Sequence, residues 1–346
     1  MTTVSGPVAD NHLFDTFLTR AGLLAAGERA GYVPLTGGVS SDIWRVDIGD
    51  RQFCIKRALS KLKVAADWFA PISRNATEVA WLETAGRIQP GAVPEVLAHD
   101  ADAGMFAMAF VPPEYARPWK EVLRSGVADT AFAARVGAVL ARLHGESAAM
   151  PGLAERFATD EAFHAIRLEP YLEATAIRHP EHAKRLAELV RVTAATRIAL
   201  VHGDVSPKNI LVGPNGPIFL DAECAWWGDP AFDLAFCLNH FLLKCLWVPT
   251  SRAGYMACFR AMAQAYGENL PADWAPDRTE DTLRRAAQLL PGLFLARVDG
   301  KSPVEYLTRD ADKDMVRAAA GAMLKTPPAD LEGVAATWER TLGDAA

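Results

Sequence analysis

The sequence has few cysteines and no excess of positive charge. Its five cysteines, Cys54, Cys224, Cys237, Cys245 and Cys258, are an odd number, and no two of them have CxxC spacing. We therefore expect neither a disulfide framework nor a zinc site. The formal net charge is −6 at pH 7, whereas nucleic-acid-binding proteins usually present a basic face. No nucleic-acid partner is expected.

The chain also lacks an uninterrupted apolar run. Its most apolar stretch, residues 232–248, contains Asp233, Asn239, His240 and Lys244. A membrane span would bury these polar side chains in lipid, so the stretch is predicted to be a core helix. The first residues, MTTVSGPVADNHLF, do not combine a basic start with an apolar core, so we expect no secretory signal peptide. These features predict a cytoplasmic protein without a membrane partner.

The length and composition of the chain are those of a globular protein with two lobes. The 346 residues are 50% hydrophobic and 23% charged, which is typical of globular proteins. Because a chain of this length exceeds one ordinary hydrophobic core, two lobes are expected.

The stretch from Val201 to Phe236 concentrates the residues that carry chemistry. Asp204 follows a short apolar run at the point where the predicted strand must turn, and Asn209 follows five residues later. Two further apolar runs, residues 210–212 and 218–220, flank a turn of Gly, Pro and Asn. This pattern predicts a β-hairpin directly after Asn209.

Asp221 and Glu223 come at the end of the predicted hairpin. A separation of two residues places both side chains on the same side of an extended chain. Magnesium prefers a few carboxylates, amide oxygens, water and substrate phosphates, so Asn209, Asp221 and Glu223 are predicted metal ligands. In the alternative interpretation the aspartates are turn or cap residues only, as most loop aspartates are.

A carboxylate near such a metal site suits phosphoryl transfer. This reaction needs a group that orients the incoming hydroxyl and cations that offset charge on the phosphate oxygens. Asp204 is the predicted orienting group, and ATP or GTP with Mg²⁺ are the expected cofactors.

A phosphate cradle is expected upstream. Gly37 and Gly38, with Ser40 and Ser41, precede a strand-like run, and their backbone N–H groups and hydroxyls would suit phosphate oxygens. A paired glycine before a strand can equally be an ordinary tight turn.

Lys56 and Glu78 are predicted to form a pair. Alternation in the strand-like run places Lys56 opposite Phe53 and Ile55, and an inward lysine is costly unless it meets an anion. Glu78 lies in the next predicted helix, where it can pair with Lys56 as in kinases. The alternative is that both side chains are solvated.

The rest of the chain is expected to be largely helical. Apolar residues recur at helical spacing from Phe132 to Leu143, and Gly145 is the predicted end of that helix. Trp226 and Trp227 directly follow the metal candidates and are either a wall of the acceptor pocket or core residues.

The motifs HGDVSPKNIL, LDAE and GDPAFDLAF resemble those of the aminoglycoside phosphotransferase and choline kinase superfamily, which is related to the protein kinases. The order of motifs extends over roughly residues 30 to 310. The resemblance implies that Asp204 positions the acceptor hydroxyl and that Asn209 and Asp221 bind magnesium. It also implies structural roles for His202 and for Asp233, which would anchor the catalytic turn.

The resemblance further implies an α+β, bilobal, protein-kinase-like fold. An N-lobe with a small antiparallel sheet is expected over residues 1–111, and a helical C-lobe with the catalytic hairpin over residues 112–346. Phe110 and Val111 would form the edge that binds adenine, and Lys208 would lie near the γ-phosphate.

Within the superfamily, the segments IKRALSKLKVAADWFAPISRNATEVAWLE and AFVPPEYARPWKEVLRSG are similar to 5-methylthioribose kinase, as is Glu223 in place of a second Asp. Those kinases carry two adjacent arginines late in the chain, whereas here Ala296 precedes Arg297. Arg297 is a candidate substrate or phosphate ligand, or else an ordinary helix-end arginine. Asn209 also differs from the 5-methylthioribose kinase pattern and matches that of the aminoglycoside phosphotransferases.

The sequence therefore predicts an ATP-dependent kinase that phosphorylates a hydroxyl of a small polar metabolite, such as a sugar or an amino alcohol. Two alternatives are an aminoglycoside O-phosphotransferase and a catalytically inactive nucleotide-binding regulator. A protein kinase is disfavoured because GDPAFDLAF leads directly into a predicted helix, without an activation segment.

Overall fold

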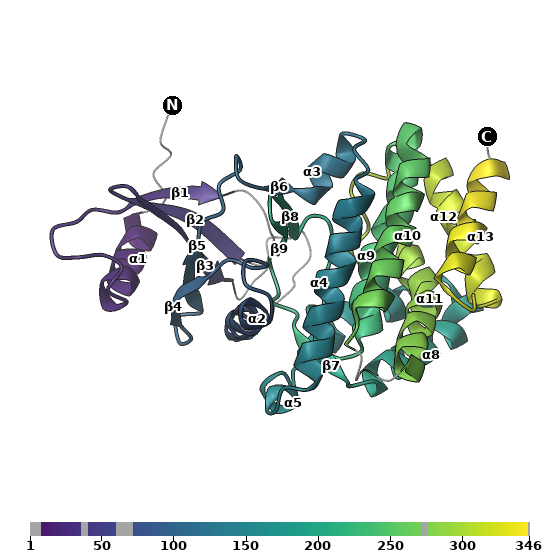
Figure 1. Ribbon diagram of the computed structural model, residues 1–346, viewed down its shortest axis with the longest axis horizontal. Helices are drawn as coiled ribbons and strands as arrows, with labels where there is room; N and C mark the ends of the chain where they lie inside the picture. The colour runs from purple at the N-terminus through teal and green to yellow at the C-terminus, as the bar shows by residue number, and fades with distance from the viewer. Residues whose placement is uncertain (1–7, 36–40, 60–71, 272–273, 275, 345–346) are drawn as a thin grey trace. The chain divides into compact units, whose positions relative to one another are not determined.

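The computed structural model describes residues 8–35, 41–59, 72–271, 274 and 276–344. Contacts divide the chain into two compact units, Met1–Ala116 and Arg117–Ala346 (Figure 1). Within the described ranges, no helix has both the length and the apolar composition needed to cross a membrane.

The first unit contains a five-stranded antiparallel sheet. Its strands are β1 (Gly31–Leu35), β2 (Ser41–Ile48), β3 (Arg51–Ala58), β4 (Val96–Asp100) and β5 (Met105–Ala109), in the order β1-β2-β3-β5-β4. β2 and β3 form a hairpin whose turn contains Gly49 at φ +57°, a backbone conformation that glycine adopts without strain.

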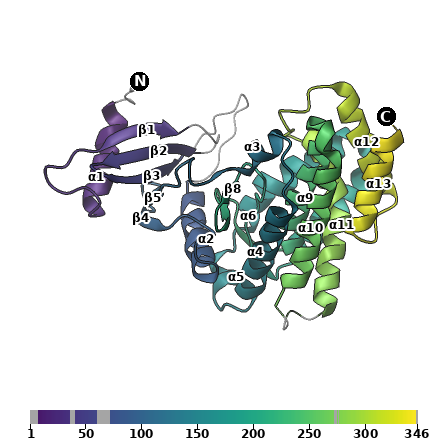
Figure 2. The ribbon, with the colours of Figure 1, turned by 45° about the horizontal axis from the view of Figure 1, so that its top comes forward.

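A helix packs on each face of this sheet (Figure 2). On one face, Phe14, Phe17 and Leu18 of α1 (Val8–Arg20) join a core that includes Phe53 and Ile55 of β3. Successive side chains of a strand point to opposite faces, so Lys56 points to the other face. There it meets α2 (Arg74–Ile88).

The second unit is mainly helical. Its helices are α3 (Trp119–Arg124), α4 (Thr130–Ala148), α5 (Leu153–Arg156), α6 (Asp160–Phe163), the π-helix η1 (His164–Glu173), α7 (Ala174–Arg178), η2 (Pro180–His182), α8 (Ala183–Ala195), α9 (Pro230–Trp247), η3 (Pro249–Ser251), α10 (Arg252–Asn269), α11 (Pro276–Asp299), α12 (Asp310–Lys325) and α13 (Leu331–Asp344).

Five short strands accompany these helices. β6 (Arg117–Pro118), β8 (Ile210–Gly213) and β9 (Gly216–Phe219) form one small antiparallel sheet, and β7 (Ala199–Val201) pairs with β10 (Trp226–Gly228). β8 and β9 are the predicted hairpin. The two small sheets flank the turn that contains Asp204.

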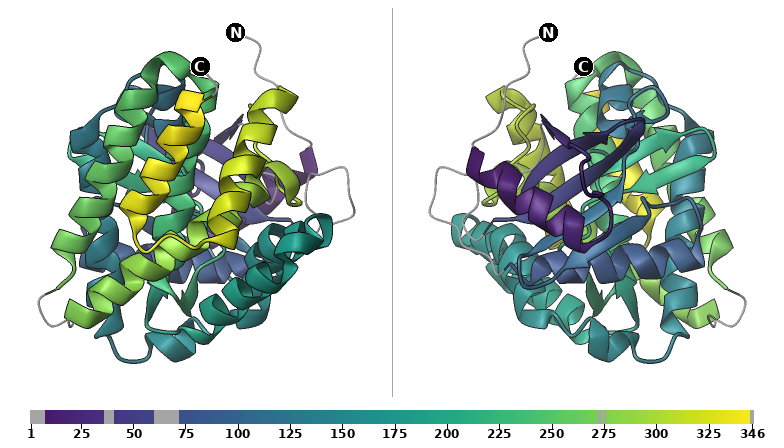
Figure 3. Two further views of the ribbon diagram at one scale, coloured as in Figure 1. Left: turned by 90° about the vertical axis from the view of Figure 1, so that its right-hand side faces the viewer. Right: turned by 90° about the vertical axis from the view of Figure 1, so that its left-hand side faces the viewer.

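Helix α9 lies at the centre of the second unit. Its start is fixed by Asp229, whose carboxylate accepts a hydrogen bond from the backbone N of Ala231, and by Pro230 in the first turn, both typical of helix starts. Every residue of α9 except Trp247 is buried, which confirms the predicted core helix. α10 and α11 pack against α9, and α12 and α13 pack beside α11 (Figure 3).

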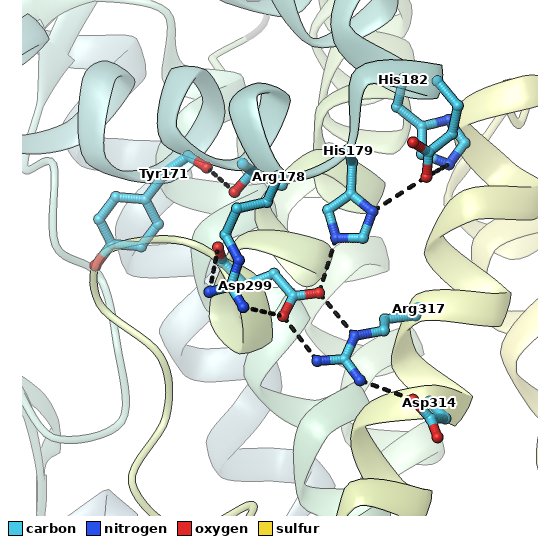
Figure 4. A network of polar contacts seen from close by, with 9 residues as sticks. Tyr171, Arg178, His179, His182, Asp299, Asp314 and Arg317 are labelled. Atoms are coloured by element: carbon cyan, nitrogen blue, oxygen red, sulfur yellow. Dashed lines mark hydrogen bonds and ion pairs between the residues drawn. The ribbon is translucent and has the colours of Figure 1, made fainter.

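The C-terminal end of α11 is held by a polar network around Asp299 (Figure 4). The Asp299 carboxylate accepts hydrogen bonds from Nε2 of His179 and from Nε and Nη2 of Arg317, each at 2.8 Å. Nη2 of Arg178 lies 3.4 Å from the same carboxylate. The network ties α11 to the segment after α7 and to α12.

Candidate active site

The site begins in the turn that follows β7, where the backbone must approach a neighbouring segment closely. Gly203 adopts φ +80°, and a Cβ at this position would lie 2.6 Å from the backbone oxygen of Cys224. Only glycine fits such a position without displacing the backbone. Gly203 thereby allows the chain to reverse just before Asp204.

Asp233, in the first turn of α9, holds this turn in place. Its carboxylate accepts hydrogen bonds from the backbone N of His202 at 2.7 Å and of Gly203 at 2.8 Å. The same carboxylate lies 3.2 Å from Nε2 of His144, whose Nδ1 contacts the hydroxyl of Tyr266 at 2.9 Å. Because Asp233 is fully buried, it acts from behind the turn rather than on a substrate.

His202 fixes the backbone on either side of the site. Its Nε2 donates to the carbonyl of Leu220 at 3.1 Å, and its Nδ1 accepts from the backbone N of Asp204 at 3.1 Å. Burial lowers the pKa of His202 despite the nearby carboxylates of Asp233 and Asp204. A neutral imidazole with one donor and one acceptor nitrogen therefore links the turn to the end of β9.

Asp204 presents a carboxylate between two cations. Its Oδ2 lies 3.1 Å from Nη2 of Arg167 and 3.2 Å from Nζ of Lys208. Burial opposes ionisation, but Lys208 and Arg167 outweigh it and hold the pKa of Asp204 below its usual range. The group is therefore an anion at neutral pH, and it can accept a hydrogen bond or a proton from a hydroxyl.

Arg167 is a residue of the site that the sequence did not predict. It lies on η1, where its Nε donates to the carbonyl of Gly203 and its Nη1 donates to the carbonyl of Ile166 at 2.6 Å. Its guanidinium also lies 5.9 Å from the ring centres of Tyr171 and Phe236. No motif in the sequence marks Arg167, because it is brought to Asp204 from a distant π-helix.

Asn209 is oriented by the same turn. Its Nδ2 donates to the backbone carbonyl of Asp204 at 3.1 Å, which leaves Oδ1 as the side-chain atom able to contact a cation. Its backbone carbonyl accepts from the N of Leu220 at 2.9 Å, so Asn209 also holds the start of the segment that carries Asp221.

Asp221 has the one positive φ among non-glycine residues of the described ranges, at +67°. Such conformations cost free energy and tend to cluster at functional sites. The negative charge of Asp221 acts on both Asp204 and His202, so the two acidic parts of the motif lie close together. Asp221 and Glu223 are both half-buried.

The side chains of Asn209, Asp221 and Glu223 suit magnesium better than a metal ion whose ligands all come from the protein. Within the described residues, no three His, Cys, Asp or Glu side chains are grouped so that they could hold a metal ion. Magnesium typically takes only one or two carboxylates and completes its shell with water and phosphates. One amide oxygen and two half-buried carboxylates fit that pattern.

In the first unit, Lys56 and Glu78 form a buried ion pair. Nζ of Lys56 lies 2.8 Å from Oε1 and 2.7 Å from Oε2 of Glu78, and each side chain is 3% exposed. Ser41 is buried at the start of β2, while Phe110 and Val111 follow β5 and are half-buried. The predicted Gly37, Gly38 and Ser40 lie outside the described residues.

The three substrate candidates lie in different surroundings. Trp226 is a core residue of β10 that stacks on Phe163 with ring centres 4.3 Å apart, and its Nε1 donates to Asp160. This contact favours the core interpretation of Trp226, and Trp227 is half-buried beside it. Arg297 lies near the end of α11, where its Nη1 donates to the hydroxyl of Tyr171 at 3.2 Å.

Comparisons with known proteins give one family and one fold. A model of the phosphotransferase enzyme family matches residues 31–279. The structure is similar to that of a choline/ethanolamine kinase family protein from Mesorhizobium loti, with 18% identity and a TM-score of 0.52 over 96% of this chain and 99% of that chain. It is also similar to choline kinase from Cryptosporidium parvum, with 9% identity and a TM-score of 0.50 over 97% of this chain and 95% of that chain. No curated protein matches the chain. The structural likeness confirms the α+β, protein-kinase-like fold expected from the sequence.

Proposed function

The chain belongs to the phosphotransferase enzyme family, and from this premise we propose that it transfers the γ-phosphoryl group of ATP or GTP to a hydroxyl of a small polar metabolite. The observation that carries the proposal is the anionic carboxylate of Asp204, held between Arg167 and Lys208 at the end of a fixed turn. An acceptor hydroxyl needs such a group to orient it.

Asp204 would hydrogen-bond the incoming hydroxyl and receive its proton. The bond from the acceptor oxygen to phosphorus forms as the bond to the nucleoside diphosphate breaks, so the products are a phosphate ester and a diphosphate. His202 and Asp233 contribute by fixing the backbone that carries Asp204.

Asn209, Asp221 and Glu223 are the proposed magnesium ligands. Magnesium would offset charge on the phosphate oxygens. Asn209 is suited to this role because its amide nitrogen is already bonded to the carbonyl of Asp204, and Asp221 because its carboxylate is half-buried beside Asp204.

Lys56 is the proposed contact for the nucleotide phosphates, and Glu78 would keep its ammonium in position. The pair at 2.7 Å supports this role, since kinases use a strand lysine and a helix glutamate in the same way. Residues 1–111 would then serve the nucleotide, with Gly37, Gly38, Ser40 and Ser41 at its phosphates and Phe110 and Val111 at its base.

The acceptor is not fixed by the family. The 5-methylthioribose branch is not confirmed by the comparisons, which give choline kinases as similar structures. An aminoglycoside as acceptor would use the same Asp204 chemistry and stays an alternative. A catalytically inactive nucleotide-binding regulator is disfavoured because Asp204, Asn209 and Asp221 are all present.

The proposal is tested by measuring ADP release with methylthioribose, aminoglycosides, choline, ethanolamine and homoserine as acceptors, extended to an unbiased metabolite screen. We expect release to depend on one acceptor and on Mg²⁺. If no acceptor in the screen stimulates ADP release or becomes phosphorylated, the proposed transfer is wrong.

A further inference from the structure

One face of α9 carries polar side chains that have no role in the proposed phosphoryl transfer. Phe236, His240 and Lys244 follow one another at intervals of four residues, so they lie on one side of the helix. Phe236 contacts Arg167, which contacts Asp204. The positive charge of Lys208, which pairs with Asp204, also acts on His240, so this face of α9 lies near the Asp204 turn.

Lys244 is buried without a carboxylate at ion-pair distance among the described residues. Its exposed fraction is 1%, and its Nζ lies 4.5 Å from the ring centre of Trp247 and 4.8 Å from that of Tyr306. Burial and the positive charge of Lys120 lower the pKa of Lys244 to about 7, against the opposing effect of Glu305 and Cys237. Aromatic faces attract a cation but do not replace the hydrogen bonds that its N–H groups lose on burial.

Three buried polar atoms in this region lack a hydrogen-bond partner within the described part of the chain. They are Nε2 of His240, Nε of Arg297 and the hydroxyl of Tyr306. The positive charges of Arg297 and Lys244 add to burial in lowering the pKa of His240, and Arg297 opposes the burial that raises the pKa of Tyr306. The groups therefore lie close enough to influence one another.

Such a concentration is unusual because most buried polar atoms in proteins are hydrogen-bonded. We call His240, Lys244, Arg297 and Tyr306 the α9 cluster. Arg297 carries a positive charge, Lys244 is partly protonated at neutral pH because its pKa is about 7, and the cluster contains no acid. A ligand with several acceptor oxygens would satisfy all four groups.

Several other cations near the α9 cluster have carboxylate partners. Lys120 pairs with Glu305, and Arg167 and Lys208 share Asp204. The contacts of Arg297 are neutral, namely Tyr171 and Ser302. Lys244 and Arg297 are thus two cations of the cluster that have no carboxylate partner among the described residues.

We propose that the α9 cluster binds an anionic group, a carboxylate or a phosphate, on the same acceptor molecule whose hydroxyl reaches Asp204. The inference rests on the proposed phosphoryl transfer and narrows its acceptor class to hydroxy acids and phosphorylated alcohols. A cationic acceptor such as choline would be repelled by Arg297 and by the protonated form of Lys244, and the cluster contains no acid to offset that repulsion.

Matched acceptor pairs test the class directly. ADP release is measured with glycerate against glycerol and gluconate against glucitol for the carboxylate, and with glucose 6-phosphate against glucose for the phosphate. We expect an anionic member to have a KM at least about tenfold below that of its neutral partner, the effect of losing charged hydrogen bonds. Turnover of neutral or cationic alcohols alone, with no preference for an anion, overturns the inference but leaves the proposed transfer intact.

The variant Lys244→Met assigns any preference to the cluster. Its KM for the anionic acceptor should rise by about tenfold or more, while its melting temperature should not fall, because the substitution removes a buried unpaired charge. Lys325→Met, at an exposed lysine in the last turn of α12, is the matched control and should change neither quantity. An unchanged KM in Lys244→Met contradicts the assignment, and Arg297→Gln provides a second variant for the same comparison.

Measuring ligand binding in the absence of turnover separates the proposed anion site from the proposed phosphoryl transfer. Gluconate, glycerate and glucose 6-phosphate should raise the melting temperature of the wild type, as ligands of the folded state do, and raise that of Lys244→Met less. A Lys244-dependent shift would support the cluster even if no acceptor were phosphorylated, in which case the proposed function alone fails. No shift with any of the three anions, or an equal shift in both proteins, counts against the cluster.

Discussion

Nη2 of Arg167 lies 3.1 Å from Oδ2 of Asp204. The same arginine donates through Nε to the carbonyl of Gly203, so it holds both the side chain and the backbone of the turn. Arg167 therefore acts as a positioning residue, because it orients the group that would receive the acceptor hydroxyl.

Replacing Arg167 by Met should lower kcat by about tenfold to a hundredfold, the effect of losing a charged hydrogen bond, with little change in the KM for nucleotide. Arg167→Lys should recover part of the loss, since it keeps the charge but not the fork of donors. Steady-state kinetics check both variants. Arg191→Met, at an exposed arginine of α8, is the control. A kcat in Arg167→Met equal to that of the wild type would show that the contact has no part in turnover.

Lys56→Met should destabilise the protein by about 3–5 kcal/mol, because it leaves Glu78 buried without this cation. The double variant Lys56→Met with Glu78→Leu should recover much of that stability but not the activity. Urea unfolding and ADP release measure the two effects. If the double variant were active, Lys56 would not be needed at the nucleotide phosphates.

Asp299 should contribute to stability only above acidic pH. Hydrogen bonds from Arg317, aided by His179, outweigh burial and lower the pKa of Asp299 to about 2, below its usual value near 3.8. A group with a depressed folded-state pKa stabilises the fold above its unfolded pKa, and that contribution is lost as the pH falls toward the folded value. Asp299→Asn should therefore cost roughly 2 kcal/mol at pH 7 and progressively less from pH 4 down to pH 2.

Thermal unfolding across this pH range checks the Asp299 prediction. Asp314 contacts the same Arg317, but its side chain is 69% exposed, so Asp314→Asn should have little effect. A pH-independent loss in Asp299→Asn would mean that its carboxylate charge is not the stabilising feature.

Gly203→Ala should destabilise the turn more than a matched substitution elsewhere. Gly152 has nearly the same φ, +79°, but a Cβ there would have nothing within 4 Å, whereas at Gly203 it would lie 2.6 Å from the carbonyl oxygen of Cys224. Gly152→Ala should cost about 1–2 kcal/mol from the backbone conformation alone. Denaturant unfolding should show a larger loss for Gly203→Ala, and equal losses would mean that the close approach is not restrictive.

The parts of the site that are local in sequence could be predicted, and the distant parts could not. Asp204, Asn209 and Asp221 are brought together by one turn and one hairpin, whose signals lie within twenty or so residues, roughly the span of a hairpin unit. Arg167 lies on a π-helix with Pro170 inside it, where the usual helical period does not apply. No local pattern connects it to Asp204.

The polar residues of α9 are a second case in which the sequence did not predict a tertiary contact. His240 and Lys244 argue against a membrane span, and the structure confirms a core helix, but the sequence gives no sign that they meet Arg297 and Tyr306. The helix predicted from Phe132 to Leu143 is present as α4, but its predicted end at Gly145 is wrong, because α4 continues to Ala148. Gly145 is required for packing instead, since a Cβ there would overlap Cδ of Pro271.

The central claim is that Asp204 receives the acceptor hydroxyl, and the variant Asp204→Asn tests it most directly. Phosphoryl transfer to the acceptor found by screening should fall by about a hundredfold to ten-thousandfold, while titration calorimetry should show that the nucleotide still binds. Transfer by Asp204→Asn at the rate of the wild type would contradict the account.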